Sequence, residues 1–280
     1  MLKIIYTTGL TGFIGQYFFK KIFNDYDVVI NFGREKNLTI HKHYLEPIFK
    51  EFNLSELKEY PADTLVHLAT YYNPNPINIA EEAQLEESNF NFPYSLCNIL
   101  KNYGLKRIIS ASSYLQLSDI QHKSLYSKTK CKFINWAKSE FELTEVFLFD
   151  TFGNNDPRGK VLDTFIINSI LSHDIQIPLK RVDINLTHVE EVADSLINAL
   201  GFKAGQYMIM SDNHLTIKEL AQRVVSIEKT STKIKATLDV NNLIRKINSF
   251  PENIYLNSLK KDFTEQIKTR YDEIKQANSI

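Results

Sequence analysis

Short apolar runs alternate with longer amphipathic segments over the first half of the chain. The runs are residues 2–6, 27–32, 64–69, 106–111 and 145–149. Each has the length and character of a buried strand. Helical spacing of apolar residues marks the segments 12–23, 89–103 and 125–141. Strands that alternate with helices predict an α/β fold, in which helices cover both faces of a doubly wound parallel sheet.

The alternation of apolar runs and amphipathic segments becomes less regular after about residue 150. A polar, glycine-containing stretch at 153–159 is typical of a loop, and we expect a helix near 161–172 and a strand at 207–210. Thr216 followed by Glu219 is the spacing of a capping box, which predicts a further helix start. We therefore expect a Rossmann-type domain over 1–152 and a smaller mixed lobe over 153–280, interleaved with the first.

Composition and charge exclude several classes of partner. The 280 residues carry 33 basic and 33 acidic side chains, and 43% of residues are hydrophobic. This balance gives no overall field that favours nucleic acid or an anionic membrane. No apolar stretch approaches the roughly 20 residues of a membrane span, and no secretory leader is evident, so we expect a soluble cytoplasmic protein. Cys97 and Cys131 lack metal-type spacing and are expected to be reduced thiols.

Three of the nine glycines fall within seven positions directly after the first apolar run. They are Gly9, Gly12 and Gly15, in the string TTGLTGFIG. Between a strand and a helix, glycine permits a tight turn and a close approach of backbone to phosphate, and the helix N-terminus then faces the pyrophosphate. The triplet predicts a dinucleotide site, with a purely structural glycine turn as the alternative.

The string Thr8-Gly9-x-x-Gly12-Phe13-Ile14-Gly15 resembles the extended branch of the short-chain dehydrogenase/reductase superfamily. Tyr126 and Lys130 match the Y-x-x-x-K motif of that superfamily. Four residues apart on a helix, the two side chains share one face, and the ammonium favours the phenolate of the tyrosine. Ser113 best matches the catalytic hydroxyl of the superfamily, and Ser112 is the alternative register. His67 and His188 are expected to be scaffold residues and no metal is expected.

The resemblance implies further binding residues. Those expected to contact the cofactor, besides the glycines, are Thr11, Phe13, Ile14, Arg34, Asn53, Leu54, Leu68, Ala69, Thr70 and Lys130. Those expected to contact the substrate are Tyr71, Asn89, Tyr114, Arg158 and Lys160.

Two departures from the wider superfamily narrow the activity. Nucleotide-sugar dehydratases carry an acidic pair directly after the catalytic hydroxyl, because elimination of water needs its own acid and base, whereas Tyr114 and Leu115 follow Ser113 here. At the end of the second strand, where NAD-specific relatives have an acid for the ribose, this chain has Arg34. Arginine suits a 2′-phosphate, so NADP(H) is the expected cofactor. The alternative is a solvated loop cation.

The stretch 148–160, LFDTFGNNDPRGK, looks like that of enzymes related to CDP-abequose and CDP-paratose synthases. It implies an NADPH-dependent reductase of a nucleotide-linked 4-keto-6-deoxysugar. Ile184 stands where many relatives have an arginine, which leaves the residues that hold the diphosphate open. The alternatives are a nucleotide-sugar epimerase with retained NAD(P), a non-catalytic NADP-binding protein, and a reductase of other ketones. The segments 89–103 and 125–141 resemble the helix pair of the superfamily's dimer, so a homodimer is expected.

Overall fold

A computed structural model describes residues 2–34, 36–43, 46–117, 124–212, 214–228, 230–239, 250–257 and 262–277. The chain divides into two compact units. The first comprises Met1–Leu148, Ala193–Met208 and Ile247–Tyr255, and the second comprises Phe149–Val192, Ile209–Lys246 and Leu256–Ile280. Each unit is therefore assembled from segments that are distant in the sequence.

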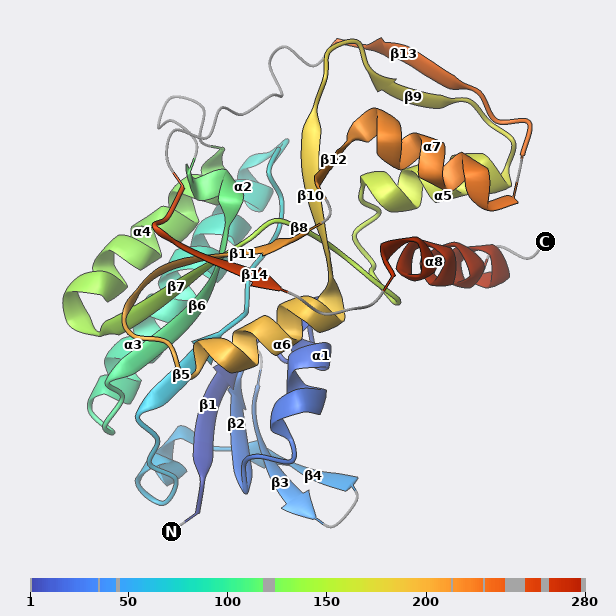
Figure 1. The fold of residues 1–280 in the computed structure, drawn as a ribbon. Coiled ribbons are helices and arrows are strands. Elements are labelled where there is room, and N and C mark those ends of the chain that lie inside the picture. The colour runs from blue at the N-terminus through green and yellow to red at the C-terminus, as the bar shows by residue number, and fades with distance from the viewer. Residues whose placement is uncertain are drawn as a thin grey trace. The chain divides into compact units, whose positions relative to one another are not determined.

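The first unit is built on a large, mostly parallel sheet (Figure 1). In the described part of the chain the strand order is β14-β11-β7-β6-β5-β1-β2-β3-β4. β1 pairs in parallel with β2 and β5, and the parallel pairing continues through β6 to β7. The strands are β1 (Ile4–Thr8), β2 (Val28–Phe32), β3 (Asn37–His43), β4 (Glu46–Phe52), β5 (Thr64–His67), β6 (Arg107–Ser113), β7 (Glu142–Leu148), β11 (Gly205–Ser211) and β14 (Asn253–Asn257). The predicted Rossmann-type sheet is confirmed.

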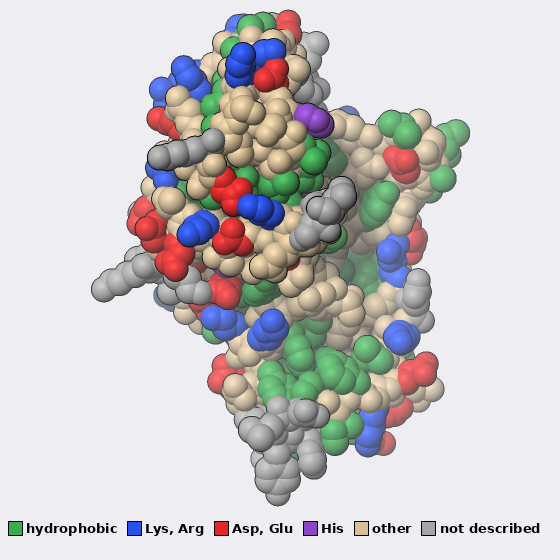
Figure 2. Space-filling view, turned by 90° about the vertical axis from the view of Figure 1, so that its right-hand side faces the viewer, with side chains coloured by type: hydrophobic (Ala, Val, Ile, Leu, Met, Phe, Trp, Pro, Cys, Tyr) green, Lys and Arg blue, Asp and Glu red, His purple; other side chains and the backbone are tan. Residues whose placement is uncertain are grey.

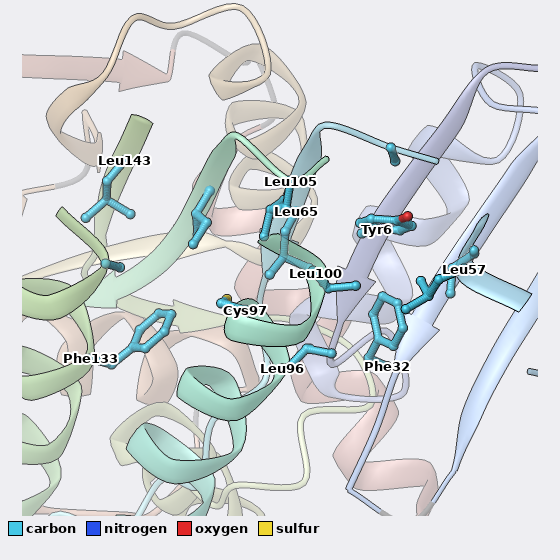
Figure 3. Packing of buried hydrophobic residues seen from close by; sticks show 14 of the residues in the cluster. Tyr6, Phe32, Leu57, Leu65, Leu96, Cys97, Leu100, Leu105, Phe133 and Leu143 are labelled. Atoms are coloured by element: carbon cyan, nitrogen blue, oxygen red, sulfur yellow. The ribbon is translucent and has the colours of Figure 1, made fainter. Parts of the chain in front are cut away.

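Helices cover both faces of this sheet. α3 (Phe92–Lys101) and α4 (Leu125–Glu140) lie on one face, and α1 (Phe13–Ile22) and α6 (Val189–Ala199) lie on the other (Figure 1). Under α3 and α4, the apolar side chains of helices and strands interlock in one cluster (Figure 3). Its labelled members are Tyr6, Phe32, Leu57, Leu65, Leu96, Cys97, Leu100, Leu105, Phe133 and Leu143. The helices expected at 12–23, 89–103 and 125–141 are all present.

One edge of the sheet differs from the expected parallel pattern. β3 runs antiparallel to β2, and β4 runs antiparallel to β3, so a hairpin takes the place of a helical crossover. The 3₁₀ turn η1 (Leu54–Lys58) follows it and begins with Asn53 in a capping box. The two strands mix polar and apolar residues and contain no long apolar run, so a search for apolar runs does not reveal them.

The second unit contains α5 (Val161–Ile170), α7 (Ile217–Glu228) and α8 (Phe263–Ala277). Its strands form two small sheets. They are β8 (Asp150–Phe152), β10 (Asp183–His188) and β12 (His214–Thr216) in one, and β9 (Ile175–Pro178) and β13 (Ile234–Leu238) in the other. Thr216 and Glu219 form the predicted capping box, because Glu219 N donates to Thr216 Oγ1 and Thr216 N donates to Glu219 Oε2.

The surface carries charges of both signs. On the face drawn in Figure 2, lysine and arginine side chains lie among aspartate and glutamate side chains. Ion pairs of the first unit include Lys21 with Asp194, which joins α1 to α6. Within the ranges that the structure describes, no helix combines the length and the apolar character needed to cross a membrane.

Candidate active site

The three glycines make a turn that joins β1 to α1 and that has no space for side chains. Gly9 has φ +78°, and its carbonyl accepts a hydrogen bond from Gly12 N at 3.0 Å. A Cβ on Gly9 would lie 2.5 Å from Ala69 N, and one on Gly15 would lie 2.0 Å from Gly9 O. Both approaches are to backbone, which cannot move away easily. Glycine is therefore required at positions 9 and 15 by the fold itself.

The N-terminus of α1 has the features of an anion site. Gly12 is the N-cap, and among the described residues no side chain caps this end of the helix. The first turn contains no acid, whereas Lys20 and Lys21 stand in the last turn. The helix dipole and the backbone amides of the first turn therefore favour negative charge here. Thr11 is exposed beside Gly12, and Phe13 and Ile14 begin the helix. The turn fits the phosphates of a dinucleotide.

Two buried polar residues hold this turn against the neighbouring strands. Asn31 of β2 accepts from Leu10 N at 3.2 Å through its Oδ1. Thr8 Oγ1 accepts from Ala69 N at 3.2 Å and lies 2.8 Å from His67 Nδ1, so the hydroxyl can donate to that nitrogen. Burial, with the charge of Lys130 as a smaller cause, lowers the pKa of His67 to about 3. His67 is thus a neutral scaffold residue that positions the loop after β5.

Arg34 is exposed just beyond the end of β2. Its Nη1 donates to Ser88 Oγ at 2.8 Å, and Ser88 is buried. Glu35 lies outside the described residues. The other residues expected at this end of the site are Asn53 and Leu54. Asn53 caps η1 through Ser55 N, and Leu54 packs against the apolar cluster of the first unit.

Asn89 connects the loop after β5 to α4. It lies in η2 (Glu87–Asn91), a short π-helical turn, and such turns are frequent at functional sites. Its Oδ1 accepts from Thr70 Oγ1 at 3.0 Å and from Tyr71 N at 2.9 Å, while its Nδ2 donates to Tyr71 O at 3.1 Å and to Thr129 Oγ1 at 3.4 Å. Leu68 and Ala69 are half-buried in the same loop. Asn89 therefore orders several of the expected binding residues.

Tyr126 and Lys130 are both buried on α4, which begins at the N-cap Ser124. Lys130 Nζ lies 6.0 Å from the centre of the Tyr126 ring and donates to Ala111 O in β6 at 3.0 Å. Burial lowers the pKa of Lys130 to about 8, although the nearby Glu145 acts to raise it. The ammonium is therefore held next to the phenol ring and to the strand that carries the two candidate serines.

The two serines are used differently. Ser112 is buried and its Oγ donates to Glu145 Oε1 at 2.8 Å. Ser113 is half-buried, and its Oγ accepts from Leu115 N at 3.3 Å. The Ser112 hydroxyl donates its proton to Glu145, whereas the Ser113 hydroxyl acts as an acceptor in its bond from Leu115 N, which leaves its O–H able to donate. Tyr114 and Leu115 follow in the 3₁₀ turn η3 (Tyr114–Leu117).

The charged residues expected to bind substrate belong to the second unit and have partners there. Arg158 pairs with buried Asp156 through Nε and Nη2, both at 2.6 Å, and its Nη2 also donates to Thr151 O at 2.7 Å. Lys160 Nζ lies 3.3 Å from Asp150 Oδ1. Burial lowers the pKa of Lys160, and Asp150 opposes this effect. His188 packs against Phe152, with ring centres 5.2 Å apart.

Comparison with known proteins shows what this arrangement is related to. The family model described as "NAD dependent epimerase/dehydratase family" matches residues 5–207. The chain belongs to this family. It is 23% identical over 235 residues to the CDP-abequose synthase of Yersinia pseudotuberculosis, a match that covers 77% of this chain and 81% of that protein.

Solved structures of the epimerase/dehydratase type share the fold. The UDP-glucose 4-epimerase of Thermus thermophilus, in complex with NAD, has a TM-score of 0.71 at 16% identity, over 98% of this chain and 99% of that one. The UDP-N-acetylglucosamine 4-epimerase of Methanobrevibacter ruminantium M1, in complex with UDP-N-acetylmuramic acid, has a TM-score of 0.72 at 19% identity, with the same coverage. The matched range of the family model contains the glycine turn and the Tyr126 and Lys130 pair.

The structure also brings residues to this site that sequence reasoning missed. The ring of Tyr72 lies edge-on to that of Tyr126, with centres 5.2 Å apart. Glu145 is buried beside Ser112, and Gln116 accepts from Ser113 N at 2.8 Å. The sequence offers one indication of Glu145, because an acidic residue stands inside the buried, mainly apolar stretch of 143–148. Nothing in the sequence pairs it with β6, since that contact depends on strand order. In the described ranges no group of three or more His, Cys, Asp or Glu side chains could hold a metal ion.

Proposed function

We propose that the chain is an NADPH-dependent reductase of a nucleotide-linked 4-keto-6-deoxysugar. The observation that carries the proposal is the local arrangement around Ser113. Lys130 Nζ lies 6.0 Å from the centre of the Tyr126 ring and donates to Ala111 O, two residues before Ser113 on β6. Tyr114 and Leu115 occupy the positions at which dehydration needs an acid and a base. Similarity to a CDP-abequose synthase supports a nucleotide-sugar substrate.

The cofactor would be held by the turn between β1 and α1 and by the loop after β5. Gly9, Gly12 and Gly15 leave space for the phosphates, and the half-buried Leu68 and Ala69 would border the ring system. Arg34 would meet the 2′-phosphate, which supports NADPH over NADH. This choice implies a cytoplasmic reaction that draws on the reduced NADPH pool. When bound, the reduced nicotinamide would supply a hydride equivalent, that is two electrons and one proton, to the carbonyl carbon.

The chain's own side chains supply the proton and the orientation. The Ser113 hydroxyl donates a hydrogen bond to the substrate carbonyl oxygen and polarises it. The phenol of Tyr126 gives its proton to that oxygen as negative charge develops there, so the carbonyl becomes a hydroxyl. Lys130 keeps the phenol acidic by the proximity of its ammonium, because a nearby positive charge stabilises the phenolate that remains.

Sugar recognition would use residues of both units. Tyr71 and Asn89 are fixed to each other by two hydrogen bonds through the Tyr71 backbone, and Tyr114 stands directly after Ser113. Arg158 and Lys160 are the proposed partners of the diphosphate. Of these two, Lys160 is the stronger candidate, since Arg158 is already held by Asp156 on two atoms.

A homodimer is part of the proposal. The ring of Tyr94 on α3 lies 4.6 Å from that of Trp136 on α4, and Tyr94 and Ile99 are each more than one third exposed. An apolar surface shared by two neighbouring helices is suited to pairing with its own copy. Light scattering at micromolar concentration is expected to give twice the chain mass, and a monomer would contradict the dimer.

The test of the function is a pair of initial-rate assays, with NADPH and with NADH, on a CDP- or dTDP-linked 4-keto-6-deoxysugar. Consumption of NADPH with formation of the 6-deoxysugar is the expected result. A protein that purifies with tightly bound NAD⁺ and interconverts two nucleotide sugars without net oxidation would instead be an epimerase. That outcome would overturn the reductase proposal and leave the roles of Tyr126 and Lys130 intact.

A further inference from the structure

A buried carboxylate lies behind the strand that carries Ser113. Glu145 stands in the middle of β7 and is 3% exposed. It is opposite Ser110 in the register between β6 and β7, so its side chain lies on the same sheet face as those of Ser110 and Ser112. Its Oε1 accepts from Ser112 Oγ at 2.8 Å, and its Oε2 accepts from Gln206 Nε2 at 2.7 Å. The carboxylate is thus fixed by two different strands.

Gln116 connects Glu145 to Ser113. Its Oε1 accepts from Ser113 N at 2.8 Å, and its Nε2 points to Glu145 Oε1 at the longer distance of 3.5 Å. An ionised carboxylate only accepts hydrogen bonds, so it selects the orientation of the amide that presents NH₂ to Glu145 and oxygen to Ser113 N. Reversal of the amide would place two donors against each other at Ser113. Glu145 and the Ser113 N–H therefore favour the same orientation of the Gln116 amide, and Glu145 supports the turn after β6 through it.

Glu145 also acts on Lys130. The titratable groups around the Lys130 ammonium are His67 on β5, Glu145 on β7, and Tyr126 and Cys131 on α4. His67 is neutral, and burial lowers the pKa of Lys130. Among the influences that raise the pKa of Lys130, the charge of Glu145 is the largest. Burial raises the pKa of Glu145 in turn, while Gln206, Ser112 and Lys130 oppose this. The two groups stabilise each other's charged form.

We propose that Glu145 is a positioning residue for the group Ser113, Tyr126 and Lys130. It fixes the Gln116 amide that holds the Ser113 backbone, and it is the counter-charge of the Lys130 ammonium. This role rests on the proposed reductase function for its activity readout. The geometry itself does not depend on which sugar is reduced, and no comparison assigns a role to this residue.

The test uses Glu145→Gln with Glu142→Gln as the matched control, because Glu142 is an exposed acid on the same strand. In Glu145→Gln we expect kcat to fall by about 10- to 100-fold with little change in the KM of the sugar. The alkaline limb of the pH profile should move to lower pH by about 1 unit, since Lys130 loses its counter-charge. Glu142→Gln should behave as the wild type. The double variant Glu145→Gln with Gln116→Glu returns a carboxylate to the same cluster and should recover much of kcat.

Thermal unfolding of each variant separates positioning from simple loss of fold. The proposal is overturned if Glu145→Gln folds and the alkaline limb of its pH profile does not move. It is also overturned if kcat in the double variant stays as low as in Glu145→Gln. A second readout needs no sugar. The pH at which NADPH affinity declines, measured by its fluorescence, should fall in Glu145→Gln and not in Glu142→Gln. If the wild type reduces no keto sugar, the proposed function fails, and this binding measurement still decides the role of Glu145.

Discussion

Arg34 and Ser88 are joined by a hydrogen bond of 2.8 Å, from the guanidinium at the end of β2 to a buried hydroxyl in η2. The bond uses Nη1, and within the described part of the chain the Arg34 guanidinium forms no ion pair with an acidic side chain. It fixes one nitrogen of the guanidinium to η2. Arg34 and Ser88 can therefore be tested separately, because Arg34 carries the positive charge and Ser88 only orients the guanidinium.

The first prediction concerns cofactor choice. Arg34→Ala should raise the KM for NADPH by about 10- to 150-fold, since a charge-assisted contact to a phosphate is worth roughly 1.5–3 kcal/mol. The KM for NADH should change little, because the contact exists only with the 2′-phosphate. Ser88→Ala keeps the charge and should retain the preference for NADPH. Initial rates measured with NADPH and with NADH give both KM values for each protein. If wild type and Arg34→Ala preferred NADPH to the same degree, Arg34 would be only a solvated loop cation.

The second prediction separates the roles of Tyr126 and Lys130. Tyr126→Phe should lower kcat by about 10²- to 10⁴-fold with cofactor affinity nearly unchanged, because only the proton donor is lost. Lys130→Met should lower both kcat and cofactor affinity. A Phe variant with near-normal turnover would contradict the assignment of Tyr126.

The order of the main elements could be predicted from the sequence because it depends on local patterns. Apolar runs located β1, β2, β5, β6 and β7, and helical spacing located α1, α3 and α4. The hairpin of β3 and β4 was missed, because its strands mix polar with apolar residues and contain no long apolar run. β14 and α8 were also missed. Their place depends on partners that are distant in the sequence, such as Asp163, which lies 2.9 Å from Arg270 of α8.

For the site, motifs could indicate residues close in sequence but not the residues that support them. The glycine turn is indicated by its spacing between a strand and a helix, and the Tyr126 and Lys130 pair is indicated by its resemblance to the superfamily motif. Glu145, Gln116 and Gln206 meet only because β6, β7 and β11 are neighbours in the sheet. In the same way the sequence indicated Arg158 only as a substrate contact, whereas the structure pairs it with Asp156. Buried partners of this kind are set by tertiary packing and leave no local pattern.

The third prediction is a pH dependence with opposite signs for activity and stability. Lys130 is charged below its pKa of about 8, so activity that needs the ammonium should decline as pH rises through about 8. In the unfolded chain the same lysine keeps its proton up to the ordinary value of 10.5. Between these values the unfolded state binds more protons, so this residue makes the free energy of unfolding rise with pH. In wild type, activity should fall and the free energy of unfolding should rise as pH increases above about 8. In Lys130→Met, the rise in the free energy of unfolding should be smaller.

The fourth prediction distinguishes glycines needed for folding from one needed for phosphate. Gly15→Ala should prevent stable folding or cost several kcal/mol, because its Cβ would meet Gly9 O at 2.0 Å. At Gly12 a Cβ would lie 3.3 Å from the same oxygen, so a small shift accommodates it. Gly12→Ala should therefore fold and lose cofactor affinity. Gly201→Ala, at 3.4 Å from Asn198 O, is the neutral control. Thermal unfolding and NADPH titration measure the two effects.

The last prediction concerns Arg158, for which the resemblance and the structure suggest different uses. Its guanidinium holds Asp156 on both carboxylate oxygens, and the Asp156 side chain is only 2% exposed. Arg158→Met would leave that carboxylate buried without its main partner and should lower the free energy of unfolding by about 3–5 kcal/mol. Adding Asp156→Asn should restore a large part of this loss, because the unpaired charge is removed. Lys160→Met, next to the less buried Asp150, should cost less stability and should raise the KM of the nucleotide sugar. Urea unfolding and steady-state kinetics on the three proteins decide the matter. A stable Arg158→Met protein with a raised KM would show that Arg158 holds the diphosphate rather than the loop.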